Sequence, residues 1–97
     1  MLIDEMDKRL KQKIACAEMD AARRAGASTK LKSVEKKVFR NSCLDAAEEG
    51  EMCKMALTRG YEIVVVAAGN EYVYRTEGLL LRLVVGQDRG KKLDCDF

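Results

Sequence analysis

The side chains that most often carry chemistry are unevenly represented in this chain of 97 residues, which has four cysteines and no histidine. Without an imidazole it has no Ser-His or Cys-His pair and no histidine metal ligand. A zinc site would need all four thiolates, yet the chain has no CxxC and its cysteine spacings match no zinc ribbon or knuckle. The glycines match neither a Walker A loop nor GxGxxG. We therefore expect no enzymatic activity, no catalytic residue, no metal and no cofactor.

The cysteine positions also argue against a disulfide framework. Cys16, Cys43 and Cys53 fall within helical patterns. If Cys43 and Cys53 shared one helix, their spacing would separate them by about 15 Å along its axis, beyond the reach of a disulfide. We expect these three to be reduced, partly buried small residues, and Cys95 to cross-link only incidentally from the tail.

An acidic cluster offers oxygen ligands for a cation, but its spacing lacks the alternating Asp/Asn loop of an EF-hand. Most of its members would lie in the first turns of a helix, where acids complement the helix dipole. We favour that structural role. The cluster comprises Asp45, Glu48, Glu49 and Glu51.

A basic run is the stronger candidate for a binding surface. On a helix, part of it would form one arc opposite Leu31, Val34 and Val38. Such a face can contact a phosphate backbone or an acidic protein surface, although most charge runs are simply solvated. The run comprises Arg23, Arg24, Lys30, Lys32, Lys36, Lys37 and Arg40, of which Lys32, Lys36, Lys37 and Arg40 would form the arc.

The elements that would position these residues begin with a helix over residues 4–25. Its apolar residues recur at steps of three and four from Ile3 to Ala25, and Gly26 stands at the C′ position. A second helix is predicted from Thr29. The capping-box sequence SCLD at residues 42–45 predicts a third from about residue 43 to 59, closed by Gly60. One long kinked helix over residues 29–59 is the alternative.

Residues 61–85 predict three antiparallel strands joined by two short turns, Gly69-Asn70 and Glu77-Gly78. This arrangement pairs Val65 with Tyr74, and Tyr74 with Leu81. A helix starting at Thr76 is the alternative for the last strand.

Alternation along these strands sorts the side chains onto two faces. One is a core face made up of Tyr61, Ile63, Val65, Ala67, Tyr72, Tyr74, Leu79, Leu81, Leu83 and Val85. The other is more apolar than a solvated face should be. It is either covered by the chain's own tail or a helix, or it is a dimer or partner surface. Its candidate contact residues are Val64, Val66, Val73, Leu80, Arg82 and Val84.

Taken together, the sequence predicts one α+β domain: two or three N-terminal helices within residues 1–60, a three-stranded antiparallel β-meander over 61–85, and a polar tail over 86–97. Early acidic residues argue against a signal peptide, and no apolar run is long enough to span a membrane, so we expect a cytoplasmic protein. The leading hypothesis is a regulatory or inhibitory module that binds a protein stoichiometrically, of the kind with which mobile elements block a larger host complex. A homodimer through the second sheet face accompanies this hypothesis. The alternative is a nucleic-acid-binding protein that uses the basic helix.

Overall fold

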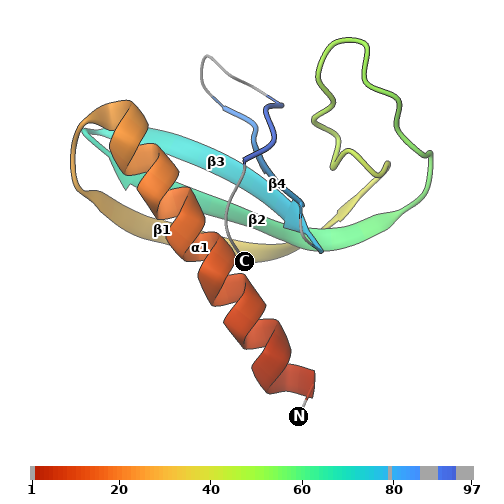
Figure 1. Ribbon diagram of the computed structural model, residues 1–97, viewed down its shortest axis with the longest axis horizontal. Helices are drawn as coiled ribbons and strands as arrows, with labels where there is room; N and C mark the ends of the chain where they lie inside the picture. The colour runs from red at the N-terminus through yellow and green to blue at the C-terminus, as the bar shows by residue number, and fades with distance from the viewer. Residues whose placement is uncertain (1, 79, 86–89, 94–97) are drawn as a thin grey trace.

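The computed structural model describes residues 2–78, 80–85 and 90–93, with side chains from Lys8 onward. Within them the chain forms the helix α1 (Leu2–Ala25) and the strands β1 (Thr29–Phe39), β2 (Thr58–Ala67), β3 (Asn70–Glu77) and β4 (Leu80–Leu83). The strands form one antiparallel sheet in the order β1-β2-β3-β4, and α1 crosses one face of it obliquely (Figure 1). The predicted α+β class is confirmed. The predicted number of helices and strands is wrong, because residues 29–60 contain no helix.

The helix α1 follows its sequence pattern closely. Gly26 has a φ of 64° and donates its N–H to the Ala22 carbonyl at 2.8 Å, which ends the helix with a left-handed C′ residue. Ala17 and Ala21 are fully buried, because small side chains let the helix lie close to the sheet. The buried sheet residues in this core are Ile63, Val65, Tyr74, Leu81 and Leu83. We call this side the helix-covered face, and the opposite side the second face.

A polar contact joins α1 to the centre of this core. The Tyr74 hydroxyl donates to the Asp20 carboxylate at 2.9 Å, and Arg24 Nε donates to the same oxygen at 2.7 Å. Tyr74 is fully buried, and this burial, followed by the bond to Asp20, raises the pKa of its hydroxyl. The contact satisfies a hydroxyl that would otherwise be buried without a partner.

The strand β1 replaces the predicted second helix, and a β-bulge explains the error. Leu31 pairs with Val65 and Ser33 with Val64, which leaves Lys32 as an extra residue. The bulge places Leu31 and Val34 on the same face although they are three residues apart. Val38 follows on that face four residues later. A bulged strand therefore produces the same three-and-four spacing as an amphipathic helix.

The β2–β3 turn lies one residue earlier than predicted. Ala68 and Gly69 both have positive φ, 52° and 77°, as a type I′ turn requires. Val65 consequently pairs with Tyr72, and the predicted Val65–Tyr74 pair is wrong. Tyr74 pairs with Leu83, so the predicted Tyr74–Leu81 pair is also wrong. Each partner shifts by two residues, and the side chains keep their predicted faces because alternation has a period of two.

Both edges of the sheet differ from the prediction. The predicted polar tail contributes residues 90–93, which hydrogen-bond to β4 and include a bridge between Lys92 and Arg82. The rest of that prediction, for residues 86–89 and 94–97, lies outside the described residues. The strand β1 forms the other edge and carries lysines, which oppose edge-to-edge pairing with another sheet. In the described part of the chain, no helix has the length and apolar character needed to cross a membrane.

Candidate functional site

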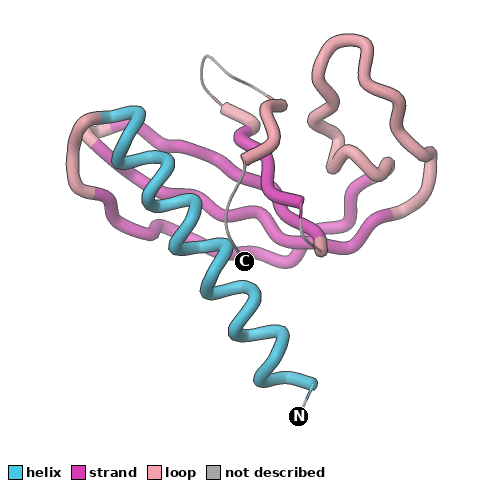
Figure 2. The backbone as a smooth tube through the Cα atoms, viewed as in Figure 1, coloured by secondary structure: helices cyan, strands magenta, loops and turns pink. Residues whose placement is uncertain are grey.

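The second face carries two arginines on neighbouring strands. Arg75 of β3 pairs with Arg82 of β4, and partners in an antiparallel pair project to the same side. Two adjacent like charges destabilise a sheet unless each finds its own acceptors. Both arginines find acceptors in the loop between β1 and β2, residues 40–57 (Figure 2), which we call the 40–57 loop.

Arg82 is only 1% exposed. Its Nη1 donates to the Ala46 carbonyl at 3.2 Å, the Gly90 carbonyl at 2.8 Å and Glu51 Oε1 at 2.7 Å, while Nη2 donates to Glu51 Oε2. Among the described residues, Arg82 Nε is the buried side-chain donor left without a partner. A buried cation is tolerated only when such partners neutralise it. Arg82 therefore ties β4 to both the 40–57 loop and residues 90–93.

Arg75 makes a second attachment to the same loop. Its Nε donates to Glu62 Oε2 at 3.2 Å, and its Nη1 donates to the carbonyls of Leu44 at 2.9 Å and Asp45 at 3.3 Å. Its guanidinium also lies 5.4 Å from the centre of the Phe39 ring, within the range of a cation–π contact. Together the two arginines bind three consecutive backbone carbonyls, those of residues 44–46.

Side chains that predicted a helix cap instead form a turn at the start of the 40–57 loop. Asn41 Oδ1 accepts the N–H groups of Cys43 at 3.0 Å and Asp45 at 3.1 Å. Ser42 Oγ accepts the Lys54 N–H at 2.8 Å, which joins the two limbs of the loop. Leu44 and Asp45 have φ of 59° and 55°, the left-handed region that breaks a helix. The predicted third helix is therefore wrong.

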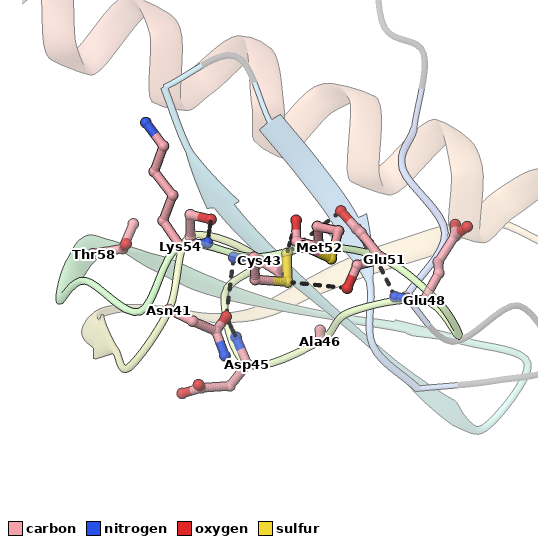
Figure 3. The surroundings of a disulfide bond; sticks show 12 residues. Asn41, Cys43, Asp45, Ala46, Glu48, Glu51, Met52, Lys54 and Thr58 are labelled. Atoms are coloured by element: carbon pink, nitrogen blue, oxygen red, sulfur yellow. Dashed lines mark hydrogen bonds between the residues drawn. A yellow bond between two sulfur atoms is a disulfide. The ribbon is translucent and has the colours of Figure 1, made fainter.

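The two limbs are also joined covalently, by a disulfide between Cys43 and Cys53 (Figure 3). Their Cα atoms lie 5.6 Å apart, well within disulfide range, because the chain between them is a loop and not a helix. Cys16 is disulfide-bonded as well, and Cys95 lies outside the described residues. The expectation that Cys16, Cys43 and Cys53 are reduced is therefore wrong.

Glu51 lies at the meeting point of the disulfide and Arg82. The bond from Arg82, followed by one from the Glu48 N–H, lowers the pKa of Glu51 to about 2. Lys92 Nζ is 3.4 Å from the same carboxylate. Glu51 Oε2 also lies 3.4 Å from Cys43 Sγ, a simple contact because an oxidised sulfur has no proton to donate.

A potential metal-ligand set lies here, although no metal is expected from the sequence. Sγ of Cys43, Sγ of Cys53 and a Glu51 oxygen all lie within 4.8 Å of one another. Metals bind the thiolate form of cysteine, whereas here the two sulfurs are bonded to each other. The carboxylate is engaged by Arg82. This arrangement serves to hold the loop.

The 40–57 loop exposes three large apolar side chains. Met52, Met55 and Leu57 are 94%, 84% and 77% exposed. Sequence patterns did not indicate these residues, because the segment was expected to be helical. Two turn-forming residues, Asn41 and Ser42, directly before Cys43 were the available signal that the cysteines flank a loop.

The predicted basic residues do not share one arc. Lys36 and Lys37 are neighbours on β1, so they point to opposite faces of the sheet. Lys32 is the bulge residue and forms an ion pair with Glu71. Of the others, Arg23 is exposed in the last turn of α1, Arg24 pairs with Asp20, Lys30 is exposed on β1, and Arg40 Nε is 3.8 Å from Asp45.

The predicted dimer or partner face is divided by the 40–57 loop. Arg82 lies beneath the loop and Val84 is 4% exposed, so neither is available to a partner. The four other residues keep partial exposure on the second face: Val64, Val66, Val73 and Leu80.

Comparison with known proteins yields one family match. The family model described as "Domain of unknown function (DUF8738)" matches residues 14–83, which run from the middle of α1 to the end of β4 and include the 40–57 loop. No curated protein and no solved structure matches the chain.

Proposed function

We propose that this chain, which belongs to the family described as Domain of unknown function (DUF8738), is a non-enzymatic module that acts by stoichiometric protein–protein binding. The observation that carries the proposal is the exposure of Met52, Met55 and Leu57 on one loop. Large apolar side chains gathered on a surface often mark binding sites. Methionine suits such a surface because its flexible, polarisable side chain adapts to a partner.

The anchoring of the 40–57 loop supports the same proposal. The Cys43–Cys53 bond and the contacts of Arg75 and Arg82 restrict the loop before any partner arrives. Binding to a restricted loop costs less conformational entropy than binding to a flexible one. The role we propose is regulatory or inhibitory: the module occupies a surface of a larger complex and performs no reaction.

The oxidation state of the Cys43–Cys53 pair depends on the compartment in which the protein acts. Disulfides persist in oxidising environments and are rare in a reducing cytoplasm. A cytoplasmic location would therefore be accompanied by reduction of the Cys43–Cys53 bond and loosening of the loop. Thiol alkylation of the protein as isolated from its host distinguishes the two states.

The experiment that tests the binding surface compares exposed methionines of the 40–57 loop with an exposed methionine of α1. We replace Met52 and Met55 together by serine, and as a matched control replace Met19, which is 67% exposed on α1. A pull-down from the native host identifies partners, and titration with the purified partner then measures affinity. We expect the Met52/Met55 variant to weaken binding by at least about tenfold, as loss of interface anchors does, and Met19→Ser to leave it unchanged. Equal affinity of the two variants would reject the surface.

A homodimer through the remaining second face is the accompanying hypothesis. Its contact residues are Val64, Val66, Val73 and Leu80, which are partly exposed. Sedimentation at micromolar concentration should give twice the monomer mass, and Val73→Glu should give a folded monomer. A wild-type protein that sediments as a monomer removes this hypothesis.

Nucleic-acid binding by the basic residues is the alternative function. Their placement on opposite faces of β1 gives it less support than a single helical arc would, because one duplex cannot contact both faces. A gel shift measured at two salt concentrations tests it, since phosphate contacts weaken steeply as salt rises. The Lys36→Glu/Arg40→Glu variant then shows whether these two residues are responsible.

A further inference from the structure

A small pocket lies on the helix-covered side, away from the 40–57 loop. It is about 180 Å³ in volume and opens between the N-terminal half of α1, the start of β2 and the β3–β4 turn. The helix contributes Arg9 and Lys13, one turn apart and therefore on the same side. The strand β2 contributes Arg59 and Tyr61, and β3 contributes Glu77.

Gly60, which also lines this pocket, shows how closely the strands approach there. A Cβ at this position would lie 2.1 Å from the Thr76 carbonyl oxygen. No other residue fits without moving the backbone of β3. This part of the pocket lining therefore consists of closely packed main chain.

Lys13 is the unusual member of the pocket lining. It is 7% exposed, and no described residue forms a hydrogen bond or an ion pair with it. The aliphatic stem of a lysine can be buried while its charged end stays in contact with water. Burial lowers the pKa of Lys13, Glu77 opposes this effect and Arg9 adds to it. Glu77 is exposed and forms no ion pair with Lys13. Arg82 Nε is the buried side-chain donor without a partner among the described residues, so the Lys13 ammonium still reaches water.

The charges around the pocket are mainly positive and favour an anionic ligand. Arg9, Lys13 and Arg59 are cationic and Glu77 is the single acid among the lining residues. Arg9 and Arg59 are exposed, and their planar guanidinium groups suit two-oxygen acceptors such as phosphate and carboxylate. We propose that this pocket binds a small oxyanion, a phosphate or carboxylate group, held by Lys13 within and by Arg9 and Arg59 at the opening.

The size of the pocket limits the ligand. Sites for drug-sized molecules are roughly 300–1,000 Å³, whereas a cavity of about 150 Å³ holds benzene. The pocket therefore accommodates one phosphate or carboxylate group and a few further atoms. A larger ligand would leave its remaining part in solvent.

Titration with simple anions tests the proposal on the intact chain. We add inorganic phosphate, and separately acetate, to the protein and follow backbone amide NMR signals, with sodium chloride at matched ionic strength as the reference. We expect saturable shifts at residues 9–13, 59–61 and 77–78. Saturation by both anions identifies a general oxyanion site, whereas saturation by phosphate or acetate alone assigns the pocket to that group.

Two substitutions and a control complete the test. Lys13→Met keeps the length of the side chain and removes the charge, and Arg59→Leu alters an exposed residue that the fold does not need. Each should weaken anion binding by about tenfold, as loss of one charge-assisted hydrogen bond does. Lys11→Met, an exposed change on the same helix, should leave binding unchanged. Shifts that follow ionic strength alone, or that are equal in the Lys13 and Lys11 variants, would overturn the proposal.

Discussion

The two faces of the sheet are covered by different means. On the helix-covered face, Ala17 and Ala21 pack against Ile63 and Leu81, and all four are fully buried. On the second face, Arg75 and Arg82 of the sheet donate hydrogen bonds to backbone carbonyls of the 40–57 loop. A disulfide closes the loop (Figure 3). The first cover depends on apolar area. The second also buries Leu44 and Ala46, and adds directional polar contacts and a covalent bond.

This difference shows what a loop needs in place of a periodic apolar face. A helix presents a continuous stripe to a sheet, so each buried side chain supports its neighbours. The 40–57 loop has no such stripe: it buries Leu44 and Ala46, whereas Met52 and Met55 are exposed. The contacts of Arg75 and Arg82 therefore add to the limited apolar surface that the loop buries. Substitutions should affect the two faces in correspondingly different ways.

The largest effect is expected at Arg82. Arg82→Met removes the guanidinium donor from the Glu51 carboxylate and from two backbone carbonyls, and removing one partner of a buried ion pair costs about 3–5 kcal/mol. Denaturant unfolding measures this loss. The double variant Arg82→Met/Glu51→Met should recover part of it, because no charge then remains unpaired. A single variant within about 1 kcal/mol of the wild type would contradict the role given to Arg82.

The matching change on the helix-covered face is Leu81→Ala. Leu81 is fully buried, and truncating such a leucine costs about 3 kcal/mol through lost contacts and a cavity. Here the loss should be global, with helix and sheet unfolding in one transition. Leu31→Ala, at a 38% exposed position of β1, serves as the control and should cost less than about 1 kcal/mol.

Removing the Cys43–Cys53 bond should loosen the second face more than the helix-covered face. The Cys43→Ser/Cys53→Ser variant frees a short loop in the unfolded chain, an effect of about 2–3 kcal/mol. Substitution is preferable to reductant, because Cys16 is also disulfide-bonded. Hydrogen exchange should accelerate most at residues 41–56, whereas at Ile63 and Tyr74 it should accelerate only as far as the loss of global stability requires. Equal acceleration in both regions would mean that the loop is integral to the core.

A smaller, graded effect is expected on acidification. The pKa of Glu51 is about 2 in the folded chain against an ordinary value of 4.5, so folding favours its charged form. This contribution is complete above pH 4.5 and is lost as the pH falls through about 2. Unfolding measurements between these values should show the wild type losing its advantage over Glu51→Gln. A difference that does not change with pH would exclude Glu51 as the titrating group.

The sequence predicted the helix-covered face far better than the second face. The α1 stripe, the Gly26 terminus and the side-chain alternation of β2–β4 all follow from local patterns. Strand register was wrong by two residues, because Ala68 adopts positive φ and moves the turn. The β1 strand was mistaken for a helix because its bulge reproduces helical spacing.

The candidate site was mostly invisible to the same reasoning. Arg75 has no local signature, since its partners at Leu44 and Asp45 are backbone carbonyls distant in sequence. Arg82 appeared only as a member of an apolar face, although its contacts with Ala46 and Glu51 bury it. Backbone acceptors exist at every residue, so no side-chain pattern marks the ones that will be used.

What the sequence by itself determined is the part of the fold that depends on period: one amphipathic helix, alternating strands, and the sorting of residues between two faces. Hydrophobic burial needs only that spacing, because it has no direction. Tertiary structure alone decided the path of residues 40–57, the Cys43–Cys53 bond and the burial of Lys13. Hydrogen bonds, disulfides and pockets depend on where distant segments meet, and spacing along the chain does not contain that information.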